Sequence, residues 1–97
     1  MTVMLDRIAQ ELTIPSRELE RRSLLAYIER ERRLANLDVA DLQDRYGVRS
    51  PEDLAIRIEQ AQVYAHPAWE ELIEWEHLMS YQKRLNTWQA DLEASYV

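Results

Sequence analysis

Glu74 and His77 come closest, by type and spacing, to a chemical site in this chain. Helical bundles use this three-residue spacing to present a carboxylate and an imidazole to an iron or manganese ion. A di-metal centre needs two such pairs and further glutamates, which a single copy lacks. A symmetric dimer could supply them, with bridging candidates Glu29, Glu31, Glu70 and Glu71. We expect instead that Glu74 and His77 are surface neighbours, and that the protein is neither an enzyme nor a holder of metal or other cofactors.

Other classes of site lack the residues they need. The chain has no cysteine, which excludes disulfides, cysteine zinc sites and thiol catalysis. Its single glycine leaves no glycine-rich loop to hold a phosphate. His66 precedes Pro67, a position typical of a residue that caps a helix rather than of a metal ligand.

Charge is distributed unevenly along the 97 residues, whose net charge is −6. Residues 1–33 carry seven arginines and six acids, whereas residues 34–97 carry five basic residues and twelve acids. An acidic surface repels a phosphate backbone and suits a basic protein partner. Any contact with nucleic acid therefore belongs to the first third, where glutamates interleave with the arginines and predict ion pairs along a helix surface.

The elements that must position these residues are helices. Apolar residues at helical spacing predict a first helix over residues 5–12, and Pro15 ends it and starts a second from about Ser16. The second helix covers the arginine-rich segment and reaches Tyr46 unless Asn36–Asp38 break it, with Gly47 as a left-handed cap.

Two further helix starts are marked by proline. Ser50 is placed to cap a helix that begins at Pro51 and buries Leu54, Ile58 and Ala61. His66-Pro67 opens the last helix by the same logic. We therefore expect one all-α domain, residues 1–97, of four to five helices with a long C-terminal helix.

The last helix, residues 67–96, carries two apolar groups that fall on nearly opposite faces at about 100° per residue. We expect the first group to face the core of the chain and the second to face a partner. The first group is Trp69, Leu72, Ile73, Trp75 and Met79, and the second is Leu78, Tyr81, Leu85, Trp88, Leu92 and Tyr96. The predicted partner-binding residues are Leu78, Tyr81, Leu85, Trp88 and Leu92, with Asp91 as the acidic contact.

Two segment patterns resemble those of antitoxins. Thr2-Val3-Met4-Leu5, a short helix, a turn and residues 16–28 resemble the strand, helix, turn and helix of ribbon-helix-helix antitoxins. Residues 45–54 and 66–76 are similar to the Tyr-Gly, Ser-x-Glu-x-Leu and Trp-Glu pattern of small bacterial and archaeal antitoxin-like proteins. The resemblance implies a very short N-terminal strand that pairs between subunits and reads DNA, a C-terminal helix that binds a partner, and a small toxin, often a nuclease, encoded beside it.

Together these features predict a cytoplasmic, antitoxin-like interaction protein that occludes a small basic toxin with its C-terminal helix. No segment has the length and apolarity of a membrane span or a signal peptide. The same apolar residues would serve as the seam of a homodimer, and we expect self-association. The alternatives are a ferritin-like metal-binding helical dimer and a small DNA-binding regulator that acts through residues 1–33.

Overall fold

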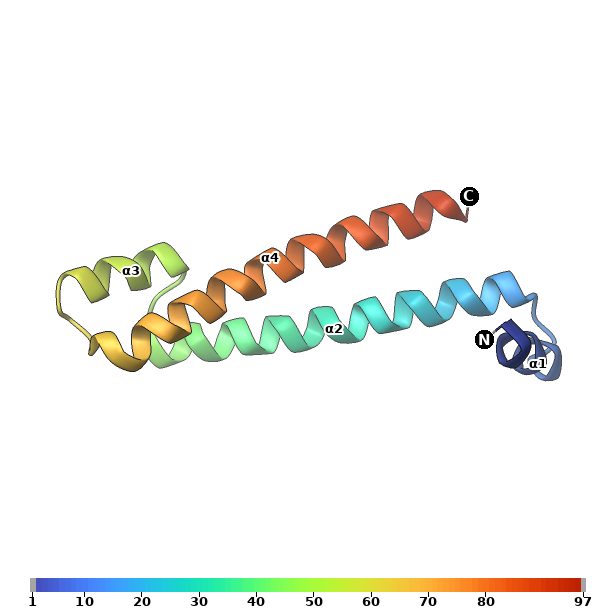
Figure 1. Cartoon of the computed structure of the whole chain (residues 1–97), viewed down its shortest axis with the longest axis horizontal. Coiled ribbons are helices and arrows are strands. Elements are labelled where there is room, and N and C mark those ends of the chain that lie inside the picture. Colours follow the sequence, from blue (N-terminus) through green and yellow to red (C-terminus); the bar gives the residue numbers. More distant parts are fainter. Residues whose placement is uncertain (1, 97) are drawn as a thin grey trace.

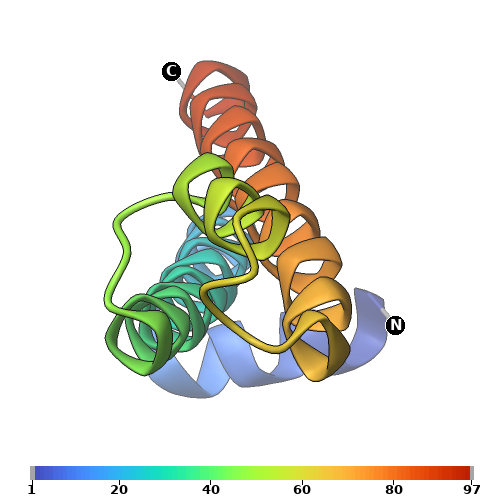
Figure 2. The same ribbon diagram turned by 90° about the vertical axis from the view of Figure 1, so that its left-hand side faces the viewer.

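Four helices make up the computed structural model, which describes residues 2–96: α1 (Thr2–Leu12), α2 (Ser16–Tyr46), α3 (Pro51–Glu59) and α4 (Ala65–Ser95). The long helices α2 and α4 run antiparallel as a hairpin, and α3 packs at its closed end (Figure 1). Helix α1 lies across the other end of α2 (Figures 1 and 2). The molecule is a rod of 60 × 22 × 19 Å. The predicted all-α class is confirmed.

The signals that end α2 and begin α3 work as predicted. Gly47 adopts a left-handed conformation (φ 62°, ψ 34°), and its N–H donates to the carbonyl of Gln43. Ser50 caps α3, because its Oγ accepts a hydrogen bond from the backbone N–H of Asp53 at 3.1 Å. Pro51 takes the first helical position, where a missing N–H costs nothing.

Helix α2 continues through Asn36–Asp38 without a break. Its buried residues Ile28, Ala35 and Leu42 are seven positions apart, so packing against α4 holds the segment helical on both sides of Asn36. The Asn36 side chain does not cap a helix, because its Oδ1 accepts a hydrogen bond from Gln82 of α4 at 2.8 Å. Tertiary packing therefore overrides the local capping tendency.

The main core lies at the closed end of the hairpin, where α3 covers α2 and α4. Trp75 and Leu54 are its largest fully buried side chains. Leu54 and Ile58 of α3 pack there as predicted, whereas Ala61 lies beyond the end of α3 and is exposed. The other buried members are Leu42, Val48, Ala68 and Leu72.

The predicted N-terminal strand is wrong. Residues 2–5 form the first turn of α1, so their backbone groups are in a helix. The described residues contain no strand with which this segment could pair. The apolar stripe that predicts a helix from Leu5 extends backward to Met4. One continuous helix therefore accounts for residues 2–5 as well as for the predicted helix.

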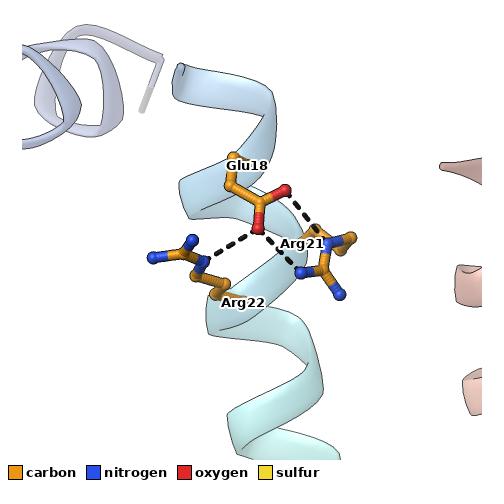
Figure 3. A network of polar contacts seen from close by, with 3 residues as sticks. All are labelled: Glu18, Arg21 and Arg22. Atoms are coloured by element: carbon orange, nitrogen blue, oxygen red, sulfur yellow. Dashed lines mark hydrogen bonds and ion pairs between the residues drawn. The ribbon is translucent and has the colours of Figure 1, made fainter. Parts of the chain in front are cut away.

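Ion pairing along α2 follows the interleaved sequence near its start (Figure 3). Glu18 accepts hydrogen bonds from Arg21, at 3.1 Å to Nε and 2.7 Å to Nη2, and from Nε of Arg22 at 2.8 Å. These bonds hold the pKa of the Glu18 carboxyl at about 2. None of the described helices is apolar over a stretch long enough to cross a membrane.

Candidate protein-binding site

The two apolar groups of α4 do not divide into a core face and an outward face. Trp75 of the first group and Leu85 of the second are both buried, with 1% and 0% of their surface exposed. Leu78, also of the second group, packs against the closed-end core. Trp69 and Ile73 of the first group are instead about half exposed. The expected outward orientation of Leu78 and Leu85 is therefore wrong.

The physical reason is a seven-residue spacing in α4. Leu78, Leu85 and Leu92 are seven positions apart, as are Ile28, Ala35 and Leu42 on α2. Such a repeat drifts about 20° per seven residues around a straight helix, or about 40° between Leu78 and Leu92. Two antiparallel helices follow the drift by winding around each other. A projection at 100° per residue therefore assigns Trp75 and Leu85 to different groups, although both are buried within the chain.

An apolar groove remains open between α2 and α4 beyond this seam. It has a volume of about 360 Å³ and lies at the open end of the hairpin, away from α3. Trp88, Asp91 and Leu92, which are three of the predicted partner-binding residues, line it from α4. Its remaining lining residues are Leu24, Tyr27, Ile28 and Ser95. We call these seven residues the open-end groove.

Trp88 and Tyr81 form an aromatic pair beside this groove. Their rings meet edge to face, with centroids 6.2 Å apart and planes at 80°. The Arg84 guanidinium lies over both rings, 5.3 Å from the centroid of Tyr81 and 5.9 Å from that of Trp88. Trp88 keeps 42% of its surface exposed despite these contacts. The pair holds Trp88 in place while leaving it open to contact.

Tyr81 is half-buried and connects the two long helices. Its hydroxyl donates to Glu31 Oε1 of α2 at 2.6 Å. This hydrogen bond, together with burial, raises the pKa of Tyr81 to about 12. Of the predicted set, Tyr81 is therefore a positioning residue, Leu78 and Leu85 are packed within the chain, and Trp88, Asp91 and Leu92 line the groove.

Three of the seven groove residues come from α2, and the apolar pattern of the last helix does not indicate them. Leu24 and Tyr27 are about half exposed, and Ile28 is buried beneath them. The signal was present in the sequence: Leu24, Tyr27 and Ile28 follow the i, i+3, i+4 spacing of a helix face. In the sequence these residues form part of one wide apolar stripe on α2. The position of α4 shows which part of that stripe it leaves uncovered.

The residues with metal-binding potential do not assemble in one copy. Glu74 and His77 are both exposed on α4. Over residues 2–96, no three His, Asp or Glu side chains gather where they could hold a metal ion. His66 lies at the irregular start of α4, where its Nδ1 is 3.6 Å from Glu70 Oε1.

A family model described as "Uncharacterized protein MJ0235 family" matches residues 1–96. The chain belongs to the MJ0235 family. No curated protein and no solved structure matches it. The open-end groove and the charges around it are the features of this MJ0235-family chain that bear on its function.

Proposed function

We propose that this protein is an antitoxin-like interaction protein, and that its open-end groove binds and neutralises a small basic toxin. The observation that carries the proposal is an exposed tryptophan at the edge of a lined apolar groove. Trp88 is 42% exposed there, next to Leu92 and opposite Tyr27 of α2. Binding hot spots are enriched in Trp and Tyr that bury in such surroundings.

Charge supports a basic partner. Asp91 lies in the groove wall and is exposed, and residues 34–97 contain seven more acids than basic residues. An acidic surface speeds the approach of a basic protein and suppresses that of nucleic acid. A nuclease toxin uses basic residues to hold its substrate, so an apolar groove with Asp91 in its wall could occupy that surface. Neutralisation would then follow from occlusion.

A growth-rescue assay tests this function. Each small open reading frame flanking the gene is expressed in a bacterial host, alone and together with this chain. We expect at least one to arrest growth alone and the chain to restore it. The groove variant Trp88→Ala should lose the rescue, because truncating a buried interface aromatic costs about 2 kcal/mol or more.

Trp69→Ala is the matched control. Trp69 is also on α4 and is 56% exposed, but it does not line the groove. We expect this variant to rescue growth as well as the original chain, with both variants keeping the helical circular dichroism of the parent. Full rescue by Trp88→Ala, or equal loss with Trp69→Ala, would contradict the assignment of the groove. Absence of any arresting neighbour would contradict the antitoxin role.

A further inference from the structure

Helix α1 has an apolar face, and the rest of the chain covers only one side of that face. Ala9 is buried against the rest of the molecule, with 1% of its surface exposed. Met4, Ile8 and Leu12 lie one turn apart along the adjoining face and are 57%, 40% and 58% exposed. An 11-residue helix is marginal in water without apolar packing. This face of α1 therefore favours contact with another apolar surface.

The stripe on α1 is complementary to itself. Ile8 lies near the middle of the helix, with Met4 one turn before it and Leu12 one turn after it. Two copies of α1 placed antiparallel about a two-fold axis at Ile8 bring Ile8 against Ile8 and Met4 against the second copy's Leu12. A two-fold interface uses the same patch on both subunits, and this stripe satisfies that requirement.

The charges beside the stripe match the same arrangement. Arg7 and Glu11 are adjacent to it, form an ion pair at 3.9 Å within one copy, and are each 69% exposed. In the antiparallel pairing, Arg7 comes beside the second copy's Glu11, and Glu11 beside the second copy's Arg7. Each carboxylate then has two guanidinium neighbours. A parallel pairing would instead set each of these charges level with its own copy.

The surface area of the chain is consistent with an additional interface. The chain exposes 7274 Å², whereas a compact chain of its mass exposes about 5,800 Å². The excess of about 1,400 Å² comes from the elongated shape of the chain, 60 × 22 × 19 Å, and is larger than the roughly 800 Å² that each partner buries in an interface of standard size.

We propose that α1 docks on α1 of a second copy of this chain, in an antiparallel dimer centred on Ile8. Helix α1 lies across the end of the rod, and the open-end groove lies between α2 and α4 along it (Figures 1 and 2). Dimerisation and binding at the groove therefore use different residues. The dimer does not depend on the toxin, and either proposal can fail alone.

Sedimentation of the purified full chain tests the dimer. We expect the original chain at high micromolar concentration to sediment at twice the mass of one copy, and Ile8→Glu to sediment as a monomer with unchanged helical circular dichroism. Ile73→Glu is the matched control, because Ile73 is a similarly exposed isoleucine (47%) on α4. It should remain dimeric.

A charge exchange tests the antiparallel register. Arg7→Glu should weaken the dimer at least tenfold, and adding Glu11→Arg to it should restore most of the loss, since both pairs are then reversed. A monomeric original chain would overturn the proposal. So would an Ile8→Glu variant that stays dimeric, or a dimer that Trp88→Ala dissociates, because the second copy would then occupy the groove. Failure of the double variant to recover would overturn the antiparallel register.

Discussion

The Tyr81 hydroxyl donates a hydrogen bond to Glu31 across the hairpin, with an O–O distance of 2.6 Å between residues fifty positions apart. The bond joins the middle of α2 to the middle of α4. The Tyr81 ring is also the edge-to-face partner of Trp88. Tyr81 therefore links the packing of the hairpin to the edge of the open-end groove.

This bond predicts an alkaline loss of stability. The folded chain raises the pKa of Tyr81 from 10.0 to about 12, so the folded state favours the protonated phenol. Its contribution is complete below pH 10 and is lost as the pH rises toward 12. Urea unfolding at several pH values should show Tyr81→Phe less stable than the original chain at pH 7. The difference should shrink between pH 10 and 12, and a difference independent of pH would contradict the assignment.

The contribution of Glu18 to stability has the opposite pH dependence and is lost at acid pH. Arg21 and Arg22 lower its pKa from 4.5 to about 2, so the folded state favours the carboxylate. The contribution is present above pH 4.5 and disappears as the pH falls toward 2. Thermal unfolding should show Glu18→Gln less stable at pH 7 and equal to the original chain near pH 2. High salt should reduce the difference at pH 7, because Glu18 is solvent-accessible.

Replacing Trp75 and replacing Trp69 should have very different effects on the free energy of unfolding, although both residues belong to the first apolar group of α4. Trp75 is buried in the closed-end core, and removing a buried Trp side chain costs about 3–5 kcal/mol. Trp75→Ala should therefore be largely unfolded by circular dichroism at 25 °C. Trp69→Ala, at an exposed position, should change the free energy of unfolding by less than about 0.5 kcal/mol. Similar losses in both variants would indicate that Trp69 is also packed.

Gly47 should resist substitution for conformational reasons alone. A Cβ at this position meets nothing within 4 Å, but the residue has φ 62°, which L side chains rarely adopt. Gly47→Ala should lower the free energy of unfolding by about 1–2 kcal/mol in urea titration. Gly47→Asn should cost less, because Asn tolerates this conformation. An Ala variant as stable as the original would show that the end of α2 can rearrange.

Local signals along the chain were sufficient to predict several element ends. Gly47 and Ser50 act through their own backbone conformation and a hydrogen bond to a near neighbour, so no distant residue is needed to infer them. The all-α class follows in the same way from helical spacing and from a chain with one glycine. The N-terminal strand was predicted wrongly because it rested on a resemblance to a family rather than on the apolar stripe, which continues through Met4.

The division of α4 between packed and exposed residues depended on tertiary structure. Leu85 and Trp88 belong to the same apolar group in the sequence, but Leu85 is fully buried and Trp88 lies at the edge of a groove. The difference arises because α2 packs against α4 and supplies Leu24 and Tyr27 to the groove. The sequence by itself determined that α4 is a helix with more apolar surface than one face can hold. The packing of α2 against it decided which of those residues are buried, because burial depends on what lies opposite a side chain.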